Sequence, residues 1–299
     1  MVGLSWDFMN LHPQMSDNMV QHLIYTSHRG HGMALSLHGA ALPPNAPSVL
    51  YAHGFKGFKD WGFVPYVGER FAAAGIRLLA MNFSHNGIGH DPLEFTELEK
   101  FRNNTLSLEV EEAREVMEMY AAGRLFGAMP GMALGALGHS RGGGVALLAF
   151  AAEPNVRAIC TWAAVSTFAR YPQHVIDRWQ HQGYLEVAHA RTGQVMQLGW
   201  QLHQDLMENI DGRLDIQAAV AGMRRPLCIV HGTSDESVPE DDARALFEWA
   251  DSGGAELHLI PGAGHTFGAR HPFEQSNPHL EDALNHTLDF FIRHLNTAP

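Results

Sequence analysis

The sequence predicts an α/β protein with a mostly parallel central sheet and helices on both faces. Over most of the 299 residues, short apolar segments of strand character alternate with segments whose apolar residues recur at helical spacing. This alternation is typical of parallel strands joined by crossover helices. Hydrophobic residues make up 45% of the chain, which is enough to fill a core between such layers.

Before residue 165 the chain is predicted to run as a hairpin followed by alternating strands and helices. Two segments of alternating polarity flank a Gly-rich turn at 29–32, which indicates the hairpin. Gly75 ends the first segment with helical spacing. We expect strands over 22–27, 33–38, 48–53, 76–83, 132–137 and 156–162, and helices over 63–74, 106–120 and 142–152.

Residues 166–223 break the alternation, because they are rich in His, Gln, Arg and Trp and contain no buried-strand run. We interpret them as an insertion into a core formed by 1–165 and 224–299. Within the insertion we expect helices over 175–180 and 201–209 and a hairpin over 184–198 that turns at 191–193. The core then resumes, with strands over 227–231 and 257–260 and helices over 241–249 and 280–295.

The charge balance excludes several classes of partner. The chain has 32 acidic and 20 basic residues, for a formal net charge of −12, which disfavours binding to nucleic acid or to anionic membrane. No apolar run approaches the ~20 residues that span a bilayer. Residues 1–21 lack the basic start and apolar stretch of a signal peptide. We therefore expect a cytoplasmic protein without nucleic-acid or membrane partners, and the sequence leaves open whether it forms a homo-oligomer.

Twenty histidines raise the question of a metal site. The sequence contains no H-E-x-x-H motif and no paired C-x-x-C motif. His28 and His31 flank the first turn without an evident third ligand, whereas His85, His90 and Asp91 share a loop and form a somewhat better cluster that could contact substrate. We expect neither group to hold a metal, no cofactor, and solvated positions for most other histidines.

Two further groups of residues are expected to be structural. Cys160 and Cys228 lie in strand-like apolar runs, which indicates buried, inert thiols. Acidic residues recur through the helix predicted over 106–120, where they are expected to form a solvated face: Glu109, Glu111, Glu112, Glu115 and Glu118.

The strongest motif is G-x-S-x-G at 138–142, between a predicted strand and a predicted helix. A serine on such a tight turn has a strained backbone and projects its hydroxyl away from the sheet. The alternative is a Gly-rich turn in which Ser140 only caps the helix.

The reaction also needs donors for the oxyanion. The residue after a nucleophile commonly supplies one oxyanion donor, here the N–H of Arg141, and Phe55 in the loop at 53–57 is a candidate for the second. That loop could equally be an ordinary glycine turn.

A serine hydroxyl is a weak nucleophile and needs a base that is itself held in place. Asp235 and His265 each follow a predicted strand, and the carboxyl ends of parallel strands gather at one edge of a sheet. Alone, Asp235 is compatible with a turn residue and His265 with a solvated loop histidine. Their occurrence with Ser140 in the order Ser, Asp, His favours a catalytic triad.

With these motifs the sequence resembles the α/β-hydrolase superfamily over nearly its whole length. The resemblance rests on HGF at 53–55, GHSRG at 138–142, HGTSDESVP at 231–239 and GAGHTF at 262–267. More narrowly, the chain looks like bacterial esterases and dienelactone-hydrolase-like proteins that include cinnamoyl and feruloyl esterases. The resemblance implies that Ser140 is the nucleophile, His265 the base and Asp235 its orienting acid, and that the insertion is a cap over the substrate pocket. Arg141 is a departure from this resemblance, because many of these esterases carry Gln or another residue at that position.

These residues predict a serine hydrolase, most directly a carboxylesterase that cleaves small-molecule esters through an acyl-enzyme intermediate. The alternatives are an amide or peptide hydrolase, a C–C hydrolase with the same triad, and a catalytically silent ligand-binding protein. Aromatic candidates for the pocket are Trp61, Trp179, Tyr184 and Trp200. We expect at least two of the three aromatics in the insertion to pack the cap onto the core instead.

Overall fold

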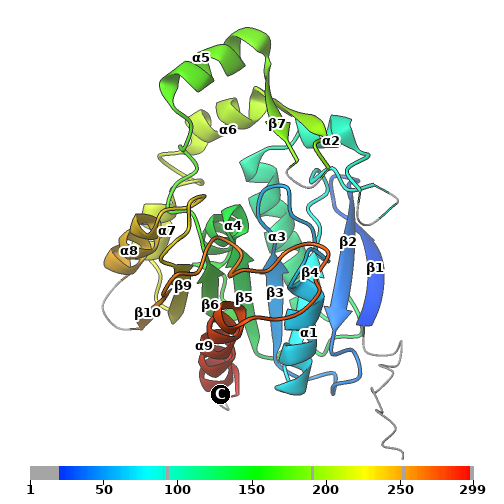
Figure 1. The fold of residues 1–299 in the computed structure, drawn as a ribbon. Coiled ribbons are helices and arrows are strands. Elements are labelled where there is room, and N and C mark those ends of the chain that lie inside the picture. The colour runs from blue at the N-terminus through cyan, green and yellow to red at the C-terminus, as the bar shows by residue number, and fades with distance from the viewer. Residues whose placement is uncertain (1–19, 90, 92–93, 190–191, 251–253, 297–299) are drawn as a thin grey trace, which may run out of the picture.

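An eight-stranded sheet with helices on both faces forms the body of the protein (Figure 1). The computed structural model describes residues 20–89, 91, 94–189, 192–250 and 254–296. The sheet strands are β1 Val20–Thr26, β2 Gly32–His38, β3 Ser48–Ala52, β4 Arg77–Met81, β5 Leu134–His139, β6 Val156–Trp162, β9 Leu227–Gly232 and β10 Ala255–Ile260. Their order is β1-β2-β4-β3-β5-β6-β9-β10. β1–β2 and β2–β4 are antiparallel, and the other pairs are parallel.

Helices pack on both faces because successive strand residues point to opposite sides. Leu50 of β3 belongs to one core cluster, whereas its neighbours Val49 and Tyr51 belong to the other. The second cluster is closed by α1 Val64–Ala73 and α9 Pro278–Leu295. The first is closed by α3 Leu106–Ala121, α4 Arg141–Phe150 and α8 Glu240–Trp249. The predicted α/β fold is therefore confirmed.

A cap stands over the upper edge of the sheet in Figure 1 and comes from the segment predicted as an insertion. It contains α5 Gln173–Gln182, α6 Gln201–Asn209 and a separate antiparallel hairpin of β7 Tyr184–Ala188 and β8 Val195–Gly199. The predicted turn of that hairpin includes Arg191, which lies outside the described residues. The last helix of the segment, α7 Ile216–Ala221, packs instead against α4 and α8 of the core. The division at 166–223 thus stays a prediction.

Every strand and helix predicted from the sequence is present, and no end is displaced by more than two residues. Two helices were not predicted, α2 Leu98–Arg102 and α7. Both are too short to show a helical period in the sequence. None of the described helices combines the length and apolar character that crossing a membrane requires.

Candidate active site

Ser140 lies on the tight turn between β5 and α4. Its backbone has φ 58° and ψ −123°, which is a strained conformation for a residue with a side chain. A Cβ added at Gly138 would overlap the Gly142 carbonyl, and one added at Gly142 would overlap the Ala52 carbonyl. The motif glycines are therefore required by the close approach of β5, α4 and β3 at this turn.

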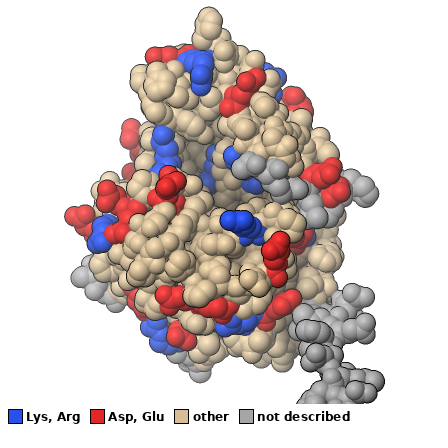
Figure 2. All heavy atoms as spheres, viewed as in Figure 1, with Lys and Arg blue, Asp and Glu red and all other residues tan. Residues whose placement is uncertain are grey.

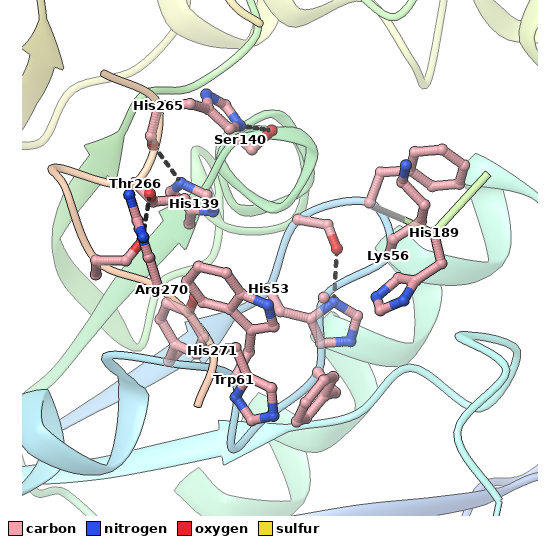
Figure 3. Close-up of a pocket in the computed structure, with 16 residues that line it drawn as sticks. His53, Lys56, Trp61, His139, Ser140, His189, His265, Thr266, Arg270 and His271 are labelled. Atoms are coloured by element: carbon pink, nitrogen blue, oxygen red, sulfur yellow. Dashed lines mark hydrogen bonds between the residues drawn. The ribbon is translucent and has the colours of Figure 1, made fainter. Parts of the chain in front are cut away.

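The structure brings Ser140, Asp235 and His265 together from three separate loops (Figure 3 shows the first and last). His265 Nε2 lies 2.9 Å from Ser140 Oγ, and His265 Nδ1 lies 2.7 Å from Asp235 Oδ2. The other carboxylate oxygen, Oδ1, accepts hydrogen bonds from the backbone N–H groups of Ser237 and Val238 at 2.8 and 2.9 Å. This is the arrangement in which an imidazole takes a proton from a hydroxyl while a carboxylate orients it.

The Asp235 carboxylate is held in its charged form. Burial by itself disfavours the charge, but the hydrogen bonds from His265, Val238 and Ser237 outweigh burial and hold the pKa of Asp235 below its ordinary value. Asp235 has no exposed side-chain surface, whereas 22% of the His265 side chain is exposed. Such a buried anion stabilises an imidazolium formed at His265.

Two more histidines support the loops around Ser140. His139 Nε2–H donates to the His265 carbonyl at 2.9 Å, and His53 Nδ1–H donates to the Gly54 carbonyl at 2.8 Å. Burial lowers the pKa of His139 to about 3 and that of His53 to about 4. Both rings are therefore neutral at pH 7 and act as hydrogen-bond donors that fix the backbone.

Acid should destabilise the fold through His139. Below pH 6.5 the unfolded chain protonates this ring, whereas the folded protein does not until about pH 3, so stability falls as the pH is lowered through that interval. His139→Gln removes the titration and retains a donor for the His265 carbonyl. We expect its free energy of unfolding to fall less steeply than that of the wild type, by about 1.4 kcal/mol per pH unit. Urea unfolding at several pH values measures this difference, and parallel pH curves would contradict it.

Phe55 and Arg141, the predicted oxyanion donors, lie beside Ser140 in one cavity wall. α4 begins at Arg141, so the Arg141 N–H has no partner within the helix. The Arg141 guanidinium lies 4.1 Å from the centroid of the Phe55 ring and 3.5 Å from Glu109 Oε1. The Phe55 ring also stacks on Phe101, with ring centroids 5.8 Å apart. The Arg141 side chain thus positions the loop that carries the second predicted donor.

Arg141→Gln should lower kcat for an ester substrate about 10- to 100-fold and change KM little, because a small shift of the Phe55 loop weakens oxyanion binding. Arg170→Gln is the matched control. Arg170 lines the same cavity and also pairs with a carboxylate, that of Asp242 at 2.7 Å. The measurement is kcat and KM of both variants and of the wild type, with Tm measured to check that each variant is folded. Equal losses in the two variants would show that Arg141 has no specific effect on the loop.

Two cavities meet at Ser140, between the cap and the sheet edge. The first has a volume of about 520 Å³, and the second, of about 430 Å³, is lined from the cap side by Leu202 of α6. Besides Ser140 and His265, the first is lined by Phe55, Phe58, Trp61, His189, Arg270 and His271. Figure 2 shows the surface hollowed between cap and core, with Lys and Arg side chains at the hollow. Both volumes suit a small molecule.

Of the four aromatics predicted for the pocket, Trp61 is the one that lines the first cavity. The prediction for Trp179 is wrong, because this side chain is fully buried and its indole N–H donates to the Leu198 carbonyl at 2.9 Å. Trp200 packs against Trp179 at 5.9 Å, and Tyr184 lies under the Arg102 guanidinium at 5.6 Å. Neither is among the residues that line the two cavities at Ser140.

Sequence reasoning missed Lys56, His189, Arg270 and His271. Lys56 follows Phe55 directly, and its Nζ donates to the Ala188 carbonyl of the cap at 2.8 Å. Arg270 and His271 lie on the chain shortly after His265. The closeness of these three residues in sequence to Phe55 and His265 could have suggested that they lie near the site. It could not show whether their side chains point into the cavity. His189 is in the cap and gave no such signal.

The predicted solvated face of α3 needs correction. Glu109 and Glu112 are buried, at 4% and 2% exposure, because the cap and the β1–β2 turn pack against α3. Glu109 pairs with Arg141, and Glu112 accepts hydrogen bonds from Ser84. Both predicted thiols, Cys160 and Cys228, are buried and free.

The profile of the Dienelactone hydrolase family matches residues 37–295. The chain belongs to this family. Its members are hydrolases with the α/β-hydrolase fold, in agreement with the resemblance inferred from the motifs. No match is found among curated protein sequences.

Solved structures similar to this dienelactone hydrolase family member have low sequence identity. The ferulic acid-bound esterase Est1E from Butyrivibrio proteoclasticus is 20% identical, with a TM-score of 0.67 over 92% of this chain and 100% of the other. The dienelactone hydrolase from Anabaena variabilis is 17% identical, with a TM-score of 0.60 over 93% and 100%. A puromycin-hydrolyzing peptidase from Mycobacterium tuberculosis is 16% identical, with a TM-score of 0.62 over 94% and 40%. These likenesses establish the fold.

Proposed function

We propose that this hydrolase family member is a carboxylesterase acting on small-molecule esters. Ser140 attacks the ester carbonyl while His265 Nε2 takes the hydroxyl proton. The N–H groups of Phe55 and Arg141 bind the oxyanion that develops. His265 then gives the proton to the leaving alcohol, an acyl-enzyme forms, and a water activated by His265 releases the acid.

The observation that carries this proposal is the unbroken chain of short contacts from Asp235 through His265 to Ser140, at 2.7 and 2.9 Å. A binding protein would need neither the strained serine backbone nor the aligned imidazole. The two cavities beside Ser140 give separate places for the acyl and alcohol parts of a small ester. Further support comes from the fold shared with the esterase Est1E, whose structure contains ferulic acid.

The rival that an observation favours is amide hydrolysis, since a puromycin-hydrolyzing peptidase shares the fold. The same triad attacks amides and esters, but an amide has a poorer leaving group. A substrate panel separates the two. The panel contains p-nitrophenyl esters of increasing acyl length, methyl hydroxycinnamates and aminoacyl p-nitroanilides, with kcat/KM measured for each.

We expect kcat/KM for the best ester to exceed that for every amide by at least about 100-fold. An amide above all esters would replace the proposal with a peptidase. A fluorophosphonate probe is run in parallel, because it labels an activated serine whatever the substrate. No labelling and no turnover of any substrate would favour the catalytically silent binding protein.

A further inference from the structure

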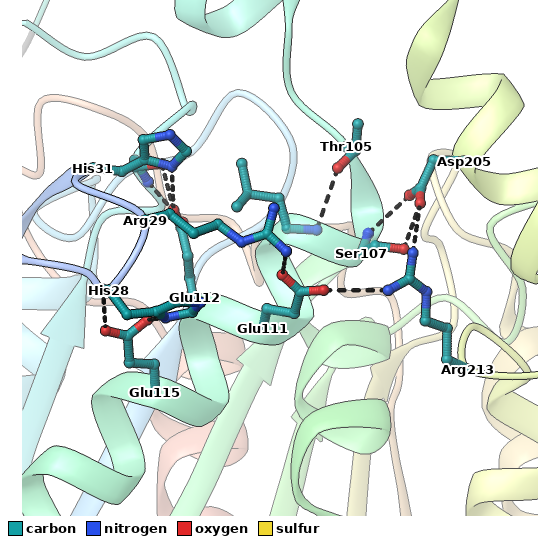
Figure 4. A network of polar contacts seen from close by, with 12 residues as sticks. His28, Arg29, His31, Thr105, Ser107, Glu111, Glu112, Glu115, Asp205 and Arg213 are labelled. Atoms are coloured by element: carbon teal, nitrogen blue, oxygen red, sulfur yellow. Dashed lines mark hydrogen bonds and ion pairs between the residues drawn. The ribbon is translucent and has the colours of Figure 1, made fainter.

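The turn between β1 and β2 meets α3 and the loop after β4 at a small cluster of metal-ligating side chains. His31 comes from the turn, His85 from the loop and Glu112 from α3. One donor atom from each of the three lies within 4.8 Å of the other two. His31 Nδ1 lies 3.7 Å from Glu112 Oε1, a contact that Figure 4 shows beside the network of Arg29 and Glu111. The sequence had placed these three residues in three unrelated groups.

One polar atom in this cluster faces Glu112 without forming a hydrogen bond to any described residue. His31 Nδ1 is buried and has no hydrogen bond within the part of the chain that the structure describes. The Glu112 side chain facing it is 3% exposed. Burying His31 Nδ1 without a hydrogen bond costs free energy, whichever ring nitrogen carries the proton. A ligand that binds both an imidazole nitrogen and a carboxylate oxygen would therefore be favoured at this position.

The other two ligand candidates are already oriented. The Ser84 N–H donates to Glu112 Oε2 at 2.9 Å, and Ser84 Oγ contacts both Glu112 Oε1 and His85 Nδ1. Outer contacts of this kind commonly fix the ligands of metal sites.

We propose that His31, His85 and Glu112 bind one zinc-type divalent cation. Two imidazoles and a carboxylate are a frequent donor set for Zn²⁺, with a fourth position left for water. Two ligands of a tetrahedral zinc ion are about 3.4 Å apart, so the 3.7 Å separation of His31 and Glu112 needs only a small closure. The ion would tie the β1–β2 turn to α3 and to the loop after β4. This proposal does not depend on the esterase function.

The test is a calorimetric titration of Zn²⁺ into the full chain after treatment with a chelator and dialysis. We expect one equivalent per chain and a rise in Tm on binding. His31→Ala and His85→Ala should each weaken Zn²⁺ binding by at least about 100-fold. His28→Ala is the matched control, because His28 is in the same turn but bonds Glu115, and it should bind Zn²⁺ as the wild type does.

A second readout is the visible spectrum with Co²⁺, which responds to nitrogen and oxygen ligands directly. The variant to compare by this Co²⁺ spectrum is Glu112→Gln, since Gln keeps the shape of the side chain and loses the charge. The proposal is wrong if the wild type takes up no Zn²⁺, or if the His31, His85 and Glu112 variants bind it unchanged while circular dichroism shows them folded. In those cases His31 and Glu112 form only a structural ion pair. Ester turnover by the metal-free protein reports separately on Ser140.

Discussion

Replacing Ser140 with Ala should lower kcat/KM for the best ester by at least about 10⁴-fold and abolish fluorophosphonate labelling. The substitution removes Ser140 Oγ, the nucleophile that we propose, which lies 2.9 Å from His265 Nε2. What remains is the weak catalysis that oxyanion binding and substrate positioning give to an attacking water. The fold should persist, because Ser140 is held through its backbone N–H to the Trp162 carbonyl at 2.9 Å.

The control for this experiment is Ser237→Ala. Ser237 lines the second cavity and is exposed, and its backbone N–H, which Ala retains, is the group that bonds Asp235. We expect this variant to keep wild-type labelling and nearly wild-type turnover. Labelling that survives in Ser140→Ala would assign the nucleophile to another residue, and turnover that survives would remove the acyl-enzyme mechanism.

The convergence of Ser140, Asp235 and His265 could be predicted from sequence because each residue lies on the loop that follows a parallel strand. The carboxyl ends of such strands share one edge, so chain order and strand assignment are enough to bring the three loops together. The glycine pattern around Ser140 carries further information, since it reflects backbone contacts that exclude any Cβ. Their catalytic roles remain a prediction for the variants to test.

The surroundings of the site could not be predicted in the same way, because they depend on packing between distant segments. The glutamates that recur along α3 resemble a solvent-exposed helix face in the sequence. Two of them, Glu109 and Glu112, are nevertheless buried, because the cap and the β1–β2 hairpin cover them. Most histidines outside the motifs were expected in solvent, but several of them are buried in the described part of the chain: His38, His189, His203 and His231. The Trp179 side chain is likewise buried within the cap and does not line the cavity.

Asp235→Asn should lower kcat about 10³- to 10⁴-fold while leaving the fold intact. Asn can keep its carbonyl oxygen on the Ser237 and Val238 N–H groups, where Asp235 Oδ1 now lies. Its NH₂ group then faces His265 Nδ1, where Asp235 Oδ2 now accepts a hydrogen bond at 2.7 Å. A donor at that place forces the His265 proton onto Nε2, which can then no longer accept the Ser140 proton.

Asp241→Asn gives the same change of charge on the exposed surface of α8 and should have kcat close to that of the wild type. In Asp235→Asn, kcat falls because His265 is in the tautomer that cannot accept the Ser140 proton. At higher pH, hydroxide can take that proton in place of His265, so the activity of this variant should rise with pH. A pH–rate profile of the three proteins measures this, with Tm as the check on folding. If Asp235→Asn matched Asp241→Asn at neutral pH, another acid would orient His265 and the arrangement in the structure would not be the working one.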